Sequence, residues 1–200
     1  MKQNTREKIL EIFRHQAGYA RTRDIKEQGI HHSHLKELQR DGTIIKVKHG
    51  LFSLAENSQY SSLIESQLSI PDGIICMGSA LSFYNLTTWD PPDIHIAIPK
   101  SRKVTLPDYP PVKLFYFSGE FYKTGITTEK LDSGETIQIY DREKTICDVI
   151  RFRNRIGIDI MKEALGEYIN SKGKNLNKLN SYAKNLKISS VLRQYLEVLI

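Results

Sequence analysis

Two short segments carry the residue types that could perform chemistry. In the first, His31, His32 and His34 lie almost side by side, and imidazole is a common ligand of zinc and other transition metals. A metal site needs ligands that converge from one helix face or from two elements, and no cysteine or carboxylate at the usual spacing accompanies these histidines. We therefore interpret them as polar side chains on an exposed helix face, and we expect no metal and no cofactor.

The second segment, Asp141-Arg142-Glu143-Lys144, has the acidic and lysine side chains that metal-dependent nucleases use. It also matches the start of a helix, because an aspartate can cap the first backbone N–H groups and a glutamate in the first turn suits the helix dipole. Lys144 and Asp148 stand four residues apart, so we expect them to pair on the helix surface. Neither a phosphate-binding glycine loop nor a G-x-S-x-G turn is present, so the sequence predicts no enzymatic activity and no catalytic residue.

Composition narrows the class of protein. The 200 residues are 40% hydrophobic and 26% charged, which excludes collagen-like, low-complexity and disordered chains. No apolar run approaches the roughly 18 residues that indicate a membrane-spanning helix. Cys76 and Cys147 are too few for a disulfide scaffold and fit a reducing compartment, so we expect a cytoplasmic protein. The formal net charge of +6 suggests an anionic partner.

The positive charge is concentrated near the start of the chain. Residues 1–54 contain 11 Lys and Arg against 6 Asp and Glu, and residues 55–200 contain 18 against 17, so the net charges are +5 and +1. The front stretch also holds five of the six histidines. A polar segment without periodicity, residues 55–62, follows it. We therefore predict two domains, residues 1–56 and residues 57–200, and expect the first to bind an anionic partner; a solvated basic face is the alternative.

The periodicity of the front domain predicts a winged helix-turn-helix. Leu35 and Leu38 form the inward face of the third of three helices, and Thr22 is the expected N-cap of the second. In such a domain the third helix lies in the major groove of DNA and the hairpin, or wing, meets the backbone. A protein-interaction module is the alternative for this fold. We expect helices near residues 4–16, 22–28 and 32–40, and strands at residues 43–48 and 51–54.

Side chains outside the apolar faces of these elements could contact DNA. On the third helix we expect His32, Ser33 and Lys36 to contact base edges, which carry the sequence information. Arg21 and Arg23, at the start of the second helix, are expected to bind backbone phosphates. The complete predicted DNA-binding set is Arg21, Arg23, His31, His32, Ser33, Lys36, Arg40, Lys46, Lys48 and His49.

The rest of the chain predicts a mixed α/β domain that ends in helices, which makes the whole chain an α+β protein. His95 lies on the less apolar side of a strand and is expected to be a surface or hydrogen-bonded histidine rather than a catalyst. Helices are expected at residues 61–68, 80–86, 142–156, 158–170, 175–186 and 189–200, and strands at residues 74–77, 94–98, 112–117 and within 126–140. Basic residues that could form a second anion-binding surface are Lys100, Arg102, Lys103, Lys144, Arg151 and Arg153.

A set of ordered motifs runs along the chain: Gly18–Ile25, Gly29-Ile30, Leu35, Ile45–Phe52, Gly78–Leu81, Ile94–Pro99, Tyr140–Asp148 and Arg151–Gly157. Together, over roughly residues 5 to 170, they resemble the AbiEi-type antitoxins of type IV toxin–antitoxin systems. The third helix departs from the arginine-rich helix expected of that family, because it begins with His31-His32-Ser33-His34.

The resemblance implies a two-domain antitoxin that takes part in phage defence. Its winged helix would bind double-stranded DNA at inverted repeats in its own promoter and repress transcription. Its second domain, with the second anion-binding surface, would neutralise a nucleotidyltransferase-like AbiEii toxin without a stable complex being required. The alternatives are a winged-helix regulator whose second domain senses a ligand or a protein partner, and an enzyme that acts on DNA through that domain.

Overall fold

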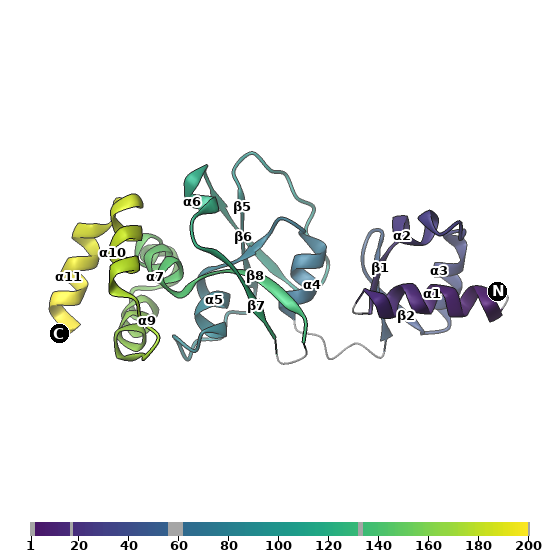
Figure 1. Ribbon diagram of the computed structural model, residues 1–200, viewed down its shortest axis with the longest axis horizontal. Coiled ribbons are helices and arrows are strands. Elements are labelled where there is room, and N and C mark those ends of the chain that lie inside the picture. Colours follow the sequence, from purple (N-terminus) through teal and green to yellow (C-terminus); the bar gives the residue numbers. More distant parts are fainter. Residues whose placement is uncertain (1–2, 17, 56–61, 132–133, 200) are drawn as a thin grey trace.

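The computed structural model describes residues 3–16, 18–55, 62–131 and 134–199. It contains two β-sheets with helices around both, and it confirms a mixed α+β architecture (Figure 1). The front elements lie at one end of an elongated molecule and the last helices at the other. Most of the predicted linker, residues 55–62, and the boundary predicted after residue 56 fall outside the described residues. None of the described helices has the length and apolar content that a bilayer span requires.

The front elements follow the order helix, strand, helix, helix and hairpin. They are α1 (Gln3–His15), β1 (Tyr19–Arg21), α2 (Thr22–Glu27), α3 (Ser33–Arg40), β2 (Ile44–Lys48) and β3 (Leu51–Leu54). The strands form an antiparallel sheet in the order β1-β3-β2. The helices and the hairpin lie within a few residues of their predicted positions. Strand β1 is absent from the prediction, because a three-residue strand has no alternation of its own and forms only by pairing with β3.

The start of α2 differs from the prediction. Arg21, not Thr22, is the N-cap, because Arg21 keeps the extended backbone of β1, with φ −92° and ψ 152°. The Arg21 N–H donates to Asp24 Oδ2 at 2.8 Å, which closes the first turn of the helix. The chain therefore passes from strand to helix without a loop.

Apolar side chains from every front element form one small core. Ile9 and Phe13 of α1 are fully buried, and so is Leu38 of α3. Burying a side chain of this size stabilises the fold by about 1.5–3 kcal/mol. The other members of the core are Ala20, Ile25, Leu35, Ile44 and Leu54. Helix α3 is thus held by its leucine side, and its opposite side is left to solvent.

The second part of the chain begins with α4 (Ser62–Ser69), β4 (Ile74–Ile75), α5 (Met77–Phe83), β5 (Ile94–Pro99), β6 (Val112–Phe117), α6 (Glu120–Lys123), β7 (Ile126–Lys130) and β8 (Thr136–Tyr140). Their sheet has the order β6-β5-β4-β8-β7 and is mixed, since β5 is parallel to β6 and β4 to β8, whereas β4 runs antiparallel to β5 and β7 to β8. The chain continues through helices α7 (Arg142–Arg151), α8 (Arg153–Ile156), α9 (Ile158–Asn170), α10 (Leu176–Asn185) and α11 (Ser189–Leu199).

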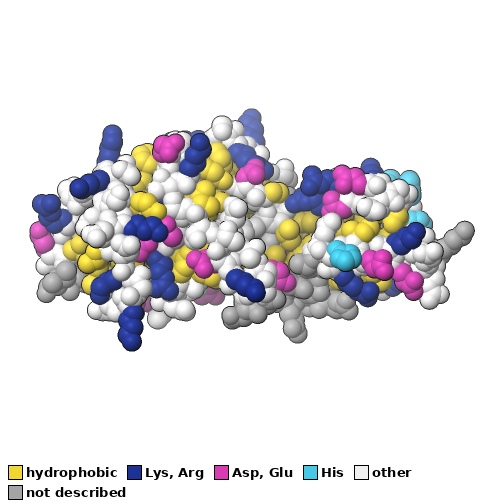
Figure 2. Space-filling view, in the orientation of Figure 1, with side chains coloured by type: hydrophobic (Ala, Val, Ile, Leu, Met, Phe, Trp, Pro, Cys, Tyr) yellow, Lys and Arg dark blue, Asp and Glu magenta, His cyan; other side chains and the backbone are white. Residues whose placement is uncertain are grey.

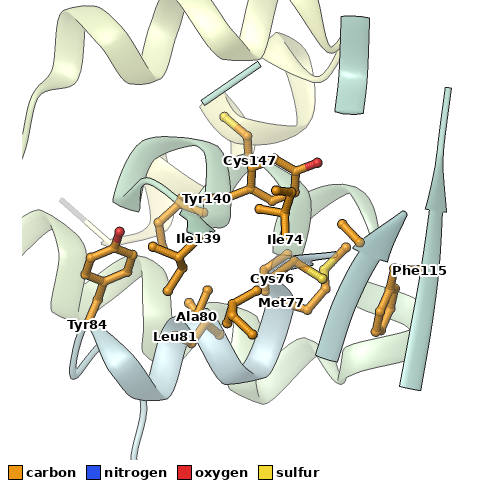
Figure 3. Close-up of a cluster of buried hydrophobic side chains, with 14 of the residues drawn as sticks. Ile74, Cys76, Met77, Ala80, Leu81, Tyr84, Phe115, Ile139, Tyr140 and Cys147 are labelled. Atoms are coloured by element: carbon orange, nitrogen blue, oxygen red, sulfur yellow. The ribbon is translucent and has the colours of Figure 1, made fainter. Parts of the chain in front are cut away.

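The main core lies between this sheet and helices α5 and α7. Figure 3 shows side chains from the β4–α5 segment, from β6 and from β8 gathered in it, with Cys147 of α7 among them. Every side chain from Glu143 to Ile150 is buried, because α7 packs against α5 on one side and against α9 and α10 on another. Helix α7 is therefore a central element of the fold rather than a surface helix.

Helix α4 joins the front sheet to the rest of the molecule. Tyr19 of β1 and Leu51 of β3 are buried as part of the main core, not of the front core. The Tyr19 hydroxyl donates to Glu65 Oε1 of α4 at 3.2 Å. Nearby, Arg21 Nη2 donates to the backbone oxygen of Leu68 at 2.5 Å. We call these contacts the joint between the front part and the back part.

Candidate nucleic-acid interface

Helix α3 presents two basic side chains on the side opposite its buried leucines. Lys36 and Arg40 are exposed and stand four residues apart, one turn along the helix. Neither has a hydrogen bond or an ion pair with another described residue. Because neither is hydrogen-bonded or ion-paired to a carboxylate of the described chain, both can meet an external anion.

The end of α3 is held by a network that connects α1 to the residues following α3. Arg6 of α1 donates to Asp41 Oδ2 and to Thr43 Oγ1, each at 2.5 Å. The hydrogen bonds from Arg6 and Thr43 lower the pKa of Asp41 to about 2. Asp41 follows Arg40 directly, yet its carboxylate points to Arg6. This contact spans 35 residues of sequence, so no local pattern could have predicted it.

The histidines at the start of α3 are used in different ways. His31 Nδ1 lies 2.8 Å from Ser33 Oγ and accepts the Ser33 N–H at 3.3 Å, so the two residues close the first turn of the helix together. The His31 and His32 rings lie 4.4 Å apart, and His32 is exposed. Desolvation and the positive charges of neighbouring side chains, including Lys26 and Lys36, lower the pKa of His32. His32 therefore remains available to a partner, whereas Ser33 is half-buried and engaged.

The hairpin presents further polar side chains. Lys46 of β2 and His49 at the turn are exposed, and Ile45 beside them is 48% exposed. The turn itself needs Gly50, whose φ of +76° lies in the left-handed region. The side chain of Lys48, also predicted to bind DNA, lies outside the described residues. Figure 2 shows the Lys, Arg and His side chains of the front part interspersed with carboxylates rather than gathered in one uniform patch.

The two arginines near the start of α2 differ in their surroundings. Arg23 is exposed, and its Nε lies 3.4 Å from Asp24 Oδ1. Arg21 is half-buried, and its guanidinium belongs to the joint, where it donates to Leu68. Arg23 therefore lies at the surface, whereas the side chain of Arg21 is hydrogen-bonded between the two parts of the chain.

One residue of the predicted second anion-binding surface does not lie at the surface. Lys144 is fully buried, so the prediction that it lies on a surface, and that it pairs with Asp148 there, is wrong. The pair does form, but inside the protein, because α7 is covered on several sides. The ammonium also lies 4.2 Å from the ring centre of Tyr140 and 4.8 Å from that of Phe117, as in a cation–π contact. Desolvation raises the pKa of Asp148 to about 6 although Lys144 opposes the shift.

The other residues of that predicted surface are dispersed. Arg102 forms an ion pair with Asp72, while Lys100 and Lys103 are exposed. Arg151 is exposed and its guanidinium lies 4.6 Å from the ring centre of Phe121. Arg153 Nη1 donates to the Ile150 backbone oxygen at 3.1 Å, which satisfies one carbonyl at the end of α7.

The acidic segment at the start of α7 is used structurally. Asp141 Oδ1 accepts the Lys144 N–H at 2.8 Å, as the predicted N-cap should. Its other oxygen, Oδ2, accepts from the Tyr182 hydroxyl and lies 3.0 Å from Lys178 Nζ. Glu143 Oε1 accepts from the Tyr168 hydroxyl at 2.8 Å. Both carboxylates therefore tie α7 to the helices that follow it.

His95 is buried and hydrogen-bonded, one of the two states expected for it. Its Nδ1 accepts the Gly78 backbone N–H at 3.1 Å, and the backbone N–H of His95 donates to Ser79 Oγ at 2.9 Å. Desolvation lowers the pKa of His95 to about 4. An imidazole that accepts a backbone N–H in this way is neutral and serves the fold.

Comparison with known proteins supports the front part most directly. Residues 7–55 match the family model described as "Transcriptional regulator, AbiEi antitoxin", which confirms the resemblance over that stretch. No curated protein sequence matches the chain. The fold is similar to the crystal structure of the RV2827C protein from Mycobacterium tuberculosis, with a TM-score of 0.50 and 11% identity. That similarity covers 100% of this chain and 82% of the other, and at this identity it shows a shared fold alone.

Proposed function

We propose that this chain, whose residues 7–55 match the AbiEi antitoxin regulators, is a DNA-binding antitoxin that represses its own promoter. In this proposal residues 1–56 form a winged helix-turn-helix domain, with α3 in the major groove of double-stranded DNA and the hairpin β2–β3 against the backbone. Residues 57–200 form a cytoplasmic, non-enzymatic antitoxin domain that neutralises a nucleotidyltransferase-like toxin.

The exposed basic face of α3 is the observation that carries the DNA-binding proposal. Lys36 and Arg40 project from a helix that is anchored on its other side, and Lys46 and Arg23 are further exposed basic side chains of the same part of the chain. The excess positive charge of the sequence is concentrated in this part too. Such an arrangement attracts DNA phosphates and releases counterions, so the affinity should depend steeply on salt.

Binding to the DNA upstream of the protein's own coding sequence tests this proposal. We expect the fluorescence anisotropy of a labelled upstream duplex to show an affinity that falls steeply between 50 and 200 mM salt, with a slope of roughly 0.9 per phosphate contact. The triple variant Arg23→Ala, Lys36→Ala and Lys46→Ala should weaken binding and lower that slope by about 2, one unit for each of the phosphate contacts expected of Arg23 and Lys46. The matched control is Lys162→Ala, Lys172→Ala and Lys184→Ala, which removes the same charge from exposed positions of the back part. Equal losses in both variants would contradict the assignment.

Neutralisation of a toxin is tested by co-expression. We expect growth to be rescued when the chain is expressed with the neighbouring nucleotidyltransferase-like gene. A rescue that persists in the triple α3 and wing variant would place neutralisation in the back part, apart from DNA binding. Absence of such a gene beside this one, or toxicity that the chain leaves unchanged, would contradict the antitoxin role while leaving DNA binding intact.

A pocket in the back part favours a second candidate, a regulator that senses a small polar ligand. The pocket has a volume of roughly 470 Å³ and lies where β7 meets α7 and α10. Arg142, Lys178 and Glu129 line it together with the hydroxyl-bearing rings of Tyr84 and Tyr182. A change in operator affinity upon adding a polar metabolite fraction, abolished by Arg142→Ala, would favour this candidate over the antitoxin.

A further inference from the structure

We propose that α3 selects guanine bases through Lys36 and Arg40, and that the two guanines lie about two base pairs apart in the operator. The inference rests on the proposed function, because it assumes that α3 enters the major groove. It changes the sequence-based expectation, in which His32, Ser33 and Lys36 contact the bases. It also names the DNA sequence that the protein should prefer.

Burial decides which side of α3 can reach a base. Leu35 and Leu38 are 2% and 0% exposed, so the opposite side of the helix faces away from the protein. Successive residues of an α-helix are rotated by about 100°, which places Arg40 near the middle of that opposite side and Lys36 about 50° from the middle. Both side chains are long enough to extend from the helix surface to the floor of a groove.

Contacts within the protein engage three other polar side chains on or beside α3. Ser33 is half-buried and bonded to His31, so its hydroxyl already has a partner. Glu37 on the flank of the helix is half-buried and also engaged. Asp41, the carboxylate nearest to Arg40 in the sequence, is held by Arg6 and Thr43. Lys36 and Arg40 therefore have no hydrogen bond or ion pair with a carboxylate among the described residues, although the charge of Arg40 acts on the nearby Glu37 carboxylate.

The chemistry of these two side chains points to guanine. In the major groove guanine presents two acceptors, O6 and N7, and Arg and Lys are the residues that most often bind this pair. Four residues of α-helix advance about 6 Å along its axis, and DNA advances about 3.4 Å per base pair on each strand. A helix lying along the groove therefore carries Lys36 and Arg40 to bases about two steps apart.

Selection from a random duplex library with the full-length protein tests the proposal. We expect the enriched sites to contain two guanines about two base-pair steps apart, with one base pair between them. Replacing one guanine should weaken binding roughly 5- to 150-fold. Arg40→Ala should remove the preference at one of these positions and Lys36→Ala at the other. Arg40→Lys keeps the positive charge but loses the paired N–H donors of the guanidinium. This variant should retain binding to random DNA and select guanine less strongly.

Lys8→Ala provides the matched control, because Lys8 is an exposed lysine of α1 whose loss removes one charge from the same part of the chain. It should leave the selected sequence unchanged. If Arg40→Ala and Lys36→Ala weaken all sequences equally and keep the wild-type preference, the two residues bind phosphate and the inference is wrong. If the wild-type protein binds no DNA even at 50 mM salt, the proposed function itself fails, which is a separate result.

Discussion

Lys144 and Asp148 form an ion pair in which both side chains are 0% exposed. They come from successive turns of α7, the helix that lies between the sheet and the last helices. Asp148 Oδ1 is buried without a hydrogen-bond partner among the described residues, so the carboxylate is only partly compensated by the ammonium. A buried pair of this kind makes each partner strongly dependent on the other, since either one alone would be an uncompensated charge.

The first prediction follows from this dependence. Lys144→Met should lower the free energy of unfolding by about 3–5 kcal/mol, because it leaves the Asp148 carboxylate buried without its cation. The double variant Lys144→Met, Asp148→Leu should recover most of this loss, since it removes both charges and keeps apolar volume. Urea unfolding followed by circular dichroism measures both values. A double variant as unstable as the single one would show that packing, and not the charge, requires these residues.

Local rules predict the parts of the fold that depend on neighbours in sequence. The spacing of Leu35 and Leu38 identifies the buried side of α3, and Asp141 is recognisable as an N-cap because a cap needs only the next turn of its own helix. The pairing of Lys144 with Asp148 is equally local and was predicted. Its burial was not, because burial depends on α5, α9 and α10, which no pattern within α7 specifies.

The second prediction concerns the pH dependence of stability. His95 has a pKa of about 4 in the folded protein, below the value of about 6.5 expected in the unfolded chain, so the unfolded state binds more protons between these two values. Stability should therefore rise with pH across that window, and its contribution from His95 should be lost as pH falls from about 6.5 to 4. The expected size is on the order of 3 kcal/mol.

His95→Gln supplies the comparison for this prediction. Glutamine does not titrate, and its side-chain oxygen can accept the Gly78 N–H that His95 Nδ1 accepts in the wild type. The melting temperatures of the two proteins, measured between pH 4.5 and 7.5, should converge as the pH falls. A constant difference across this range would mean that His95 titrates normally in the folded state.

The third prediction concerns the joint. Arg21→Ala removes the hydrogen bond from the guanidinium to the Leu68 backbone oxygen, and Tyr19→Phe removes the one from the Tyr19 hydroxyl to Glu65. Each should cost about 1 kcal/mol in stability. We expect Arg21→Ala to leave the salt dependence of DNA binding unchanged, whereas Arg23→Ala should lower its slope by about 1. Equal reductions by the two arginine variants would restore the original expectation that Arg21 binds a phosphate.

Two contacts that the sequence did not predict join residues far apart in the chain. Arg21 meets Leu68 across 47 residues, and Arg6 meets Asp41 across 35. From the sequence alone, a basic side chain near a predicted DNA-binding helix is expected to bind a phosphate. The tertiary structure shows whether another part of the protein already binds that side chain. The sequence therefore predicts which element carries the interface, while only the tertiary structure separates the residues that face outward from those that hold the parts together.

The fourth prediction contrasts two glycines of the back part. A Cβ at Gly78 would lie 2.4 Å from the indole ring of Trp89 and 3.2 Å from Cε1 of His95, far inside van der Waals contact with the ring. The indole, whose ring centre lies 5.8 Å from that of the buried imidazole, would have to shift, so Gly78→Ala should lower the free energy of unfolding by about 1–3 kcal/mol. Gly166 lies inside α9, where an added Cβ meets nothing within 4 Å. Gly166→Ala should therefore stabilise the protein by about 0.5–1 kcal/mol through helix propensity, and melting curves of the two variants should shift in opposite directions.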